Sequence, residues 1–287
     1  MRSIRNPIPF LFSFLLLIFL SCKTLSPVNG EDALPQWEPF AVSGLDYYAG
    51  KLSNPRIEFH ALRVDLSSPD LRIVVSGGAG GGETLSSTVS SFVRDYELLA
   101  GINALPFDPV SGTEGEPRTN VGIVIADGVM ISPQHPEFDA LVFYRDGSAA
   151  IVAQSEIQSI ENIENAVGGF YRILQASEPH FGARHHSDAR HPRSAAGLSP
   201  DGRFLFLLVI DGRRPGSVGS TETETALLLK SLGASEGINF DGGGSAALAL
   251  RYADGTVRVV NTPIHGGIPG RERAVAGCLG VGIVKDL

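Results

Sequence analysis

The stretch Ile238-Asn-Phe-Asp-Gly-Gly-Gly-Ser-Ala-Ala-Leu-Ala-Leu250 places one carboxylate, Asp241, and three consecutive glycines between two apolar runs. Glycine adds no side chain to a core and loses much backbone freedom on folding, so a glycine triplet at this point needs a reason. At a strand end, it would let a ligand approach the backbone and would turn amide N–H groups toward that ligand. The alternative is an ordinary tight turn capped by Asp241. The stretch by itself leaves both interpretations open.

Two common glycine-rich motifs do not match this stretch. No lysine follows the glycines, and the spacing also differs from that of a nucleotide-binding P-loop. The segment Gly243–Ala247 lacks the second glycine of the GxSxG turn that carries the nucleophile in serine hydrolases. The stretch therefore predicts neither nucleotide binding nor a serine nucleophile.

The surrounding chain predicts an α+β domain with a mixed, mostly antiparallel sheet and a few covering helices. Hairpin signals such as Asp146-Gly147 and Asp201-Gly202 outnumber segments that could connect parallel strands. The clearest helix runs from 221 to 232, with acids in its first turn and Gly233 at its end. Apolar spacing predicts a second helix over 84–93. Strands are expected at 57–64, 71–75, 98–104, 121–125, 141–144, 149–152, 194–198, 204–210, 238–240, 246–252, 257–260 and 274–284.

The N-terminus has the pattern of an export signal. Arg2 and Arg5 precede an apolar run at 8–20, which is short for a membrane-spanning helix. Leu-Ser-Cys at the end of the run resembles the lipobox of bacterial lipoproteins, in which the cysteine, here Cys22, becomes acylated. An uncleaved membrane anchor is the alternative. We expect lipidation at Cys22, because the pattern suits lipoprotein processing better than ordinary cleavage.

This pattern divides the chain into three parts. Residues 1–22 are expected to be a signal peptide, 23–39 a polar tether, and 40–287 a single domain. The protein is then exported and held at the bacterial cell envelope by its lipid, on the periplasmic or the outer surface. Cys278 is the only other cysteine, so no disulfide is expected within the mature domain.

The composition of the 287 residues, 43% hydrophobic and 19% charged, is that of a globular protein. A formal net charge of −8 argues against a nucleic-acid partner, which would need a basic surface. It still allows an anionic ligand, because a few arginines can make a local positive pocket. Arginines cluster just before or after expected strands at 190–193, 213–214 and 271–273. Each arginine alone would suit a solvated loop, but three clusters at strand ends indicate a pocket.

Four histidines lie in one short polar segment: His180, His185, His186 and His191. Their spacing matches no common zinc pattern, and no cysteine lies nearby. We therefore expect a polar loop there and neither a metal nor a cofactor.

The segment Asn239–Ser245 resembles the N-L-D-G-G-G-S signature of the phosphodiester glycosidase family. Four further segments follow the order of that family's motifs: Gly101–Ala104, His191–Gly197, Asp211–Gly216 and Arg273–Ala276. The resemblance covers roughly residues 59 to 284. It implies an enzyme that cleaves the bond between a sugar's anomeric carbon and the phosphate of a phosphodiester.

The resemblance also implies roles for individual residues. Asp241 would stabilise or trap the oxocarbenium-like transition state, as a nucleophile or as a base for water. Glu222 or Glu224 would supply a second carboxylate. Arg193 and Arg273 would hold the departing phosphate. The other candidate substrate-binding residues are Asn103 and Asn239 for sugar hydroxyls, Gly242, Gly243, Gly244 and Ser245 for phosphate or ring, and Asp211 and Arg213 from the neighbouring motif.

Two other functions remain open at this level. A surface lipoprotein that binds a phosphate-containing glycan without cleaving it would use the same arginines but would not need Asp241. A phosphodiesterase would break the P–O bond, but the usual cluster of metal ligands is missing from the sequence. The partner in all three cases is a sugar phosphate or phosphoglycan.

Overall fold

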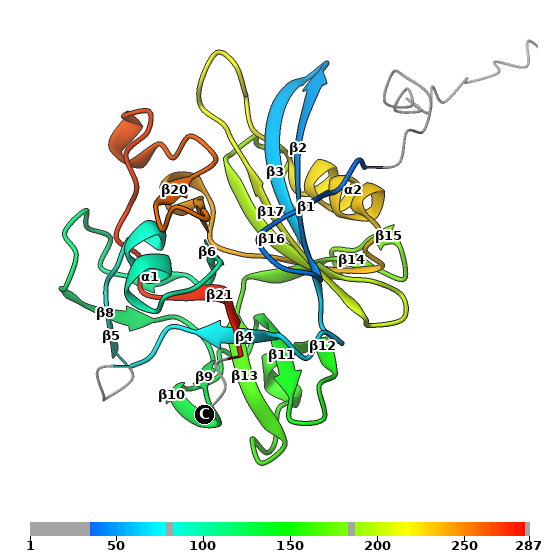
Figure 1. Ribbon diagram of the computed structural model, residues 1–287, viewed down its shortest axis with the longest axis vertical. Helices are drawn as coiled ribbons and strands as arrows, with labels where there is room; N and C mark the ends of the chain where they lie inside the picture. Colours follow the sequence, from blue (N-terminus) through cyan, green and yellow to red (C-terminus); the bar gives the residue numbers. More distant parts are fainter. Residues whose placement is uncertain (1–34, 79–82, 183–186, 285–287) are drawn as a thin grey trace, which may run out of the picture. The chain divides into compact units, whose positions relative to one another are not determined.

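The computed structural model describes residues 35–78, 83–182 and 187–284, which belong to a compact unit spanning Ala33–Leu287. Within these ranges the chain forms four β-sheets and two α-helices, α1 (Val89–Asp95) and α2 (Glu222–Leu232) (Figure 1). The pairings between these strands are antiparallel. The expectation of a mostly antiparallel architecture with few helices is confirmed, but the strands divide among several sheets instead of one.

The largest sheet has eight strands and carries part of the candidate site. Its central strand, β17 (Phe204–Ile210), is apolar throughout because both faces are covered. Leu205, Leu207 and Val209 face one hydrophobic cluster, whereas Phe206 and Leu208 face another that includes α2. The sheet order is β1 (Glu38–Pro39), β2 (Leu45–Ser53), β3 (Arg56–Asp65), β17, β16 (Arg193–Leu198), β18 (Glu236–Asn239), β14 (Tyr171–Gln175) and β15 (Glu178–Pro179).

Helix α2 has strong signals at both ends. The Thr221 hydroxyl accepts a hydrogen bond from the Glu224 N–H, and the Glu224 carboxylate accepts one from the Thr221 N–H. Gly233 ends the helix in the left-handed conformation, with φ of 114°. The helix predicted at 221–232 is confirmed.

A second sheet carries the other part of the site. Its order is β20 (Val257–Val259), β19 (Leu248–Arg251), β6 (Ala100–Asn103), β21 (Cys278–Ile283) and β4 (Leu71–Val75). Helix α1 packs on this sheet, with Phe92 and Val93 in the same cluster as Ala249 and Cys278. The third sheet has five strands in the order β10 (Val129–Ser132), β9 (Val124–Ala126), β13 (Ile163–Gly168), β11 (Asp139–Tyr144) and β12 (Ala149–Ala153). The fourth and smallest has three, in the order β5 (Glu83–Leu85), β8 (Pro117–Asn120) and β7 (Phe107–Asp108).

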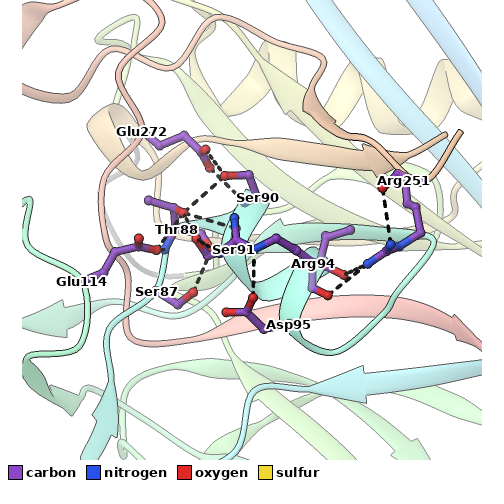
Figure 2. A network of polar contacts seen from close by, with 11 residues as sticks. Ser87, Thr88, Ser90, Ser91, Arg94, Asp95, Glu114, Arg251 and Glu272 are labelled. Carbon is purple, nitrogen blue, oxygen red and sulfur yellow. Dashed lines mark hydrogen bonds and ion pairs between the residues drawn. The ribbon is translucent and has the colours of Figure 1, made fainter.

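The short helix α1 is held by acidic side chains from distant parts of the chain (Figure 2). Glu114 accepts a 2.6 Å hydrogen bond from the N–H of Thr88, the N-cap residue, and Glu272 accepts one of 3.1 Å from the N–H of Ser90. At the other end, Arg251 donates to the carbonyls of Val93 and Arg94. Two helical turns are marginal alone, so these contacts stabilise α1 in place.

Several predicted boundaries are wrong. The helix expected over 84–93 is strand β5 followed by α1, because Thr88 caps the helix and the Ser86 hydroxyl bonds to the Thr113 carbonyl. The strands predicted at 98–104, 121–125, 246–252 and 274–284 are shorter or shifted, as β6, β9, β19 and β21. Trp37, in the expected tether, packs against Tyr48 and Phe206, so the folded unit starts before residue 40.

Candidate active site

The predicted site residues meet because three strands of the large sheet begin or end at one edge. Arg193 begins β16 and pairs with Ile210, the last residue of β17. Asn239 ends β18 and pairs with Ala195 of β16. The segments that follow β17 and β18 therefore leave the sheet beside Arg193, which brings 211–213 and 240–245 together.

The end of β6 joins this edge from the second sheet. The Asp241 N–H donates a 2.7 Å hydrogen bond to the Ala104 carbonyl. The buried Asn103 side chain bonds to the backbone of the Asp241 segment. Asn103 thus supports the loop from below, and it is not among the described residues that line the cavity.

A cavity of about 460 Å³ opens at this junction. Nine of the residues predicted for the site line it, and they come from five separate segments of the chain. These residues are Arg193, Arg213, Glu222, Asn239, Asp241, Gly242, Gly243, Gly244 and Arg273; the others that line it are Phe138, Phe170, Tyr171, His191, Pro192 and Phe240.

The glycine triplet is required by close contacts. A Cβ at residue 242 would lie 2.6 Å from the Pro192 carbonyl oxygen, and one at 244 would lie 2.5 Å from the Arg273 guanidinium. Gly243 has a φ of +62°, and a Cβ there would lie 3.2 Å from Arg213. The Gly243 N–H also donates to the Pro192 carbonyl at 2.8 Å. The triplet lets two arginines and the Pro192 backbone pack directly against the loop beside Asp241.

Asp241 is the carboxylate at the centre of this arrangement. Partial burial raises its pKa from 3.8 to about 6, since the charged form loses hydration. The Ser245 hydroxyl, the Arg273 charge and the Gly242 N–H act in the opposite direction. The carboxylate is therefore ionised near neutral pH but can be protonated in mild acid, a range suited to nucleophilic or general-base chemistry.

Two arginines that line the cavity contact uncharged side chains. Arg273 donates to His265 Nδ1 and to Ser245 Oγ, each at 3.1 Å. Arg213 lies 3.3 Å from His191 Nδ1. Burial and the adjacent arginines lower the pKa of both histidines, which favours their neutral forms. The net local charge on this side of the cavity is positive.

Arg193 and Glu222 form a second, more buried pair. Arg193 donates to the carbonyls of Ser220 and Ala189, and its guanidinium lies 3.9 Å from the Glu222 carboxylate. Glu222 starts α2 and lines the cavity. Of the two helix acids proposed as a second carboxylate, Glu222 is the one that the structure brings to the site.

Three of the predicted residues, besides Asn103, lie outside the described cavity lining. Glu224 belongs to the capping box of α2 and forms two bonds with Arg190, of 2.5 and 2.6 Å. Asp211 is buried, pairs with Arg214 and accepts from the Thr262 N–H. Ser245 is buried below the loop, between Asp241 and Arg273. Their contacts in the structure support the surrounding segments.

The aromatic residues at the cavity were not predicted. Phe138 precedes β11, Phe170 lies between β13 and β14, and Tyr171 begins β14. No motif in the sequence marks them, and they lie far from the glycine loop in sequence. The only local signal is Gly168-Gly169, a glycine pair at the end of β13 just before the two adjacent aromatic residues.

The sequence from residue 96 to 282 matches the model of the phosphodiester glycosidase family, which is more than half of the chain. The chain belongs to the phosphodiester glycosidase family. The predicted resemblance is confirmed, and the matched range contains every residue assigned to the cavity. No curated protein matches the chain in sequence.

Solved structures share the fold. The catalytic domain of zebrafish N-acetylglucosamine-1-phosphodiester α-N-acetylglucosaminidase, auto-inhibited by its pro-peptide, aligns with a TM-score of 0.65 at 20% identity, over 87% of this chain and 88% of that one. A putative exported protein from Burkholderia pseudomallei aligns with a TM-score of 0.56 at 17% identity, over 79% and 74%. A hypothetical protein from Synechocystis gives 0.58 at 12% identity, over 84% and 62%.

Some predictions fall outside the described residues. Cys22, His185 and His186 lie there, so the structure does not test the lipid anchor or the complete histidine segment. In the parts that the structure describes, there is no cluster of three or more metal-ligating side chains. No helix in those parts has the length and apolar character to cross a membrane. Cys278 is buried as a free thiol.

Proposed function

We propose that the protein hydrolyses the bond between the anomeric carbon and the phosphate oxygen of a sugar-1-phosphodiester. Membership of the phosphodiester glycosidase family supports a hydrolase of this class. The observation that carries the proposal is the position of Asp241, a carboxylate with a raised pKa that lines the cavity beside Arg213 and Arg273. An anionic substrate suits the arginines, and a cationic transition state suits the carboxylate.

In the proposed reaction the C1–O bond breaks and positive charge develops on the sugar ring. Asp241 stabilises that charge, either by bonding to C1 or by taking a proton from the attacking water. The water oxygen ends on C1, and the leaving group is a phosphate monoester. Arg213 and Arg273 stabilise the charge of the leaving phosphate, so it needs no strong general acid.

The proposal extends to the setting of the enzyme. We propose that Cys22 anchors the exported protein to the cell envelope, where phosphodiester-linked sugars of surface glycans would be its substrates. N-acetylglucosamine is the first sugar to test, because the name of the similar zebrafish protein specifies an N-acetylglucosamine-1-phosphodiester. A non-catalytic phosphoglycan-binding role is the alternative.

The decisive experiment follows the products formed from methyl N-acetylglucosamine-1-phosphodiester in water that carries a heavy oxygen isotope. Cleavage at C1 leaves the released methyl phosphate unlabelled, whereas cleavage at phosphorus labels the phosphate. Asp241→Asn should lower kcat by about a thousandfold or more. Asp254→Asn, in an exposed turn, serves as the matched control and should stay near the wild-type rate.

Three results would count against the proposal. A near-normal rate for Asp241→Asn would make the DGGGS segment a structural turn. Label in the phosphate would identify a phosphodiesterase. Binding of the diester without turnover, unchanged in Asp241→Asn, would support the non-catalytic alternative.

A further inference from the structure

Three aromatic side chains form one wall of the cavity, and here they are called the aromatic wall: Phe138, Phe170 and Tyr171. The Phe138 ring lies 5.4 Å from the Phe170 ring and 5.4 Å from the Tyr171 ring, with both pairs edge to face. All three are half-buried. None belongs to the four hydrophobic clusters found among the described residues. One face of the Phe138 ring stacks on His135, with 3.9 Å between the ring centroids, and the three residues line the cavity with the ring surface that stays exposed.

Asn239 lies next to this wall. It pairs with Tyr171 across the strands β18 and β14, and its carbonyl accepts a 2.8 Å hydrogen bond from the Phe170 N–H. The Asn239 side chain is 3% exposed and lines the cavity. Its Oδ1 has no hydrogen-bond partner among the described residues. A buried acceptor without a partner is costly, and a ligand hydroxyl would remove that cost.

The chain from Asn239 to Gly244 passes from the aromatic wall to the arginines. Asn239 adjoins Tyr171, whereas Gly243 and Gly244 lie against Arg213 and Arg273. Asp241 lies between these two ends. The cavity is thus divided into an aromatic side with one amide acceptor and a cationic side, with the carboxylate at the boundary.

We propose that the aromatic wall and Asn239 bind the sugar ring of the substrate, which rests on the function proposed above. The C–H face of a sugar ring packs on aromatic rings, while its hydroxyls need hydrogen-bond partners. Asn239 Oδ1 accepts a bond from one sugar hydroxyl. With the ring there, the anomeric carbon lies toward Asp241 and the phosphate toward Arg213 and Arg273. The group on the far side of the phosphate then extends away from the wall.

The test compares two phosphodiesters of N-acetylglucosamine, one with a methyl group and one with a benzyl group beyond the phosphate. Phe138→Leu keeps an apolar side chain but removes the aromatic face, and Tyr171→Ala removes the ring. If the wall binds the sugar, each variant should lower kcat/KM by about tenfold or more, by the same factor for both substrates. Tyr96→Ala, outside the cavity, is the control, and thermal unfolding verifies that each variant is folded.

If the wall instead binds the group beyond the phosphate, the loss will appear with the benzyl diester and vanish with the methyl diester. That result, or no loss with either diester, would overturn the inference while leaving the proposed function intact.

Absence of turnover by the wild-type protein would overturn the proposed function. In that case calorimetric titration decides the inference: Tyr171→Ala should weaken binding of N-acetylglucosamine 1-phosphate and leave binding of inorganic phosphate unchanged. Equal effects on both ligands, or none, would contradict it.

Discussion

The side-chain amide of Asn103 donates a 2.6 Å hydrogen bond to the backbone carbonyl of Asp241. The same side chain accepts, at its Oδ1, bonds from the Ser194 hydroxyl at 2.6 Å and from the Ala247 N–H at 3.2 Å. One buried amide therefore connects the end of β6 to the start of β16 and to both sides of the glycine loop. It positions the catalytic candidate without reaching the cavity.

The first prediction concerns this connection. Asn103→Ala should lower the free energy of unfolding by about 1–3 kcal/mol, because buried donors and an acceptor lose their partner. It should also reduce kcat in the folded protein, since the Asp241 loop loses its support. Urea unfolding and steady-state kinetics measure both effects. Asn162→Ala, at an exposed site, should change neither; normal activity in Asn103→Ala would show that the loop positions itself.

The second prediction is a pH dependence. The pKa of Asp241 is about 6 in the folded protein, above its usual value of 3.8, so folding disfavours the charged form. The contribution of this group to stability therefore falls as pH rises from about 4 to about 6. Asp241→Asn removes that penalty and should raise the thermal midpoint relative to wild type more at about pH 8 than at about pH 4.

Activity should follow the same ionisation in the opposite direction. Because the ionised carboxylate acts as nucleophile or base, kcat/KM should fall as pH drops below about 6. A flat profile across this range would exclude Asp241 as the titrating group, as would an unchanged stability difference for Asp241→Asn.

The third prediction concerns the phosphate side of the cavity. Arg273→Lys keeps the charge but loses the planar fork that bonds to His265 and Ser245. We expect kcat/KM for a sugar-1-phosphodiester to fall by tenfold or more, and inhibition by inorganic phosphate to weaken. Arg271→Lys, two residues earlier and exposed, is the matched control. Equal behaviour of the two variants would show that Arg273 does not hold the phosphate and would leave Arg213 as the candidate.

The fourth prediction concerns helix α1, which binds the residue next to Arg273 in the chain. Its neighbour Glu272 accepts hydrogen bonds from both the N–H and the hydroxyl of Ser90 (Figure 2). Ser90→Ala removes one of them and should let Arg273 move, which raises KM for the diester more than it lowers kcat. Ser231→Ala, a hydroxyl on α2 that bonds within its own helix, is the control. A change in kcat alone would argue against positioning through Arg273.

The fifth prediction separates two glycines of the triplet. Gly242→Ala places a Cβ against the rigid Pro192 carbonyl and should lower the thermal midpoint. Gly244→Ala places a Cβ against the mobile end of Arg273, so it should spare most of the stability and reduce activity by displacing the guanidinium. Thermal melts and kcat/KM distinguish the two. Identical effects of both variants would mean that the loop responds as one unit.

The sequence alone determined the features that depend on neighbouring residues. Helix α2 could be predicted because Thr221, its first-turn acids and Gly233 satisfy the backbone groups at its ends locally. Strand β17 could be predicted because a run that is apolar at every position suits a strand covered on both faces. The family could be recognised, and Asp241 singled out as a candidate, because Asn239–Ser245 is contiguous and the whole motif can be read along the chain.

Tertiary structure decided what each polar side chain contacts. Glu222 and Glu224 both lie in the first turn of α2, but residues two apart point to opposite sides of a helix, and only packing selects the side that meets the cavity. Asp211, like Asp241, precedes a glycine just after a strand, yet its carboxylate pairs with Arg214 and accepts a hydrogen bond from the Thr262 N–H. The aromatic wall combines Tyr171, from the edge region of the large sheet, with Phe138 and Phe170 from connecting segments, and Asn103 supports Asp241 from the second sheet. Their proximity depends on which sheets pack together, and no local sequence pattern encodes that packing.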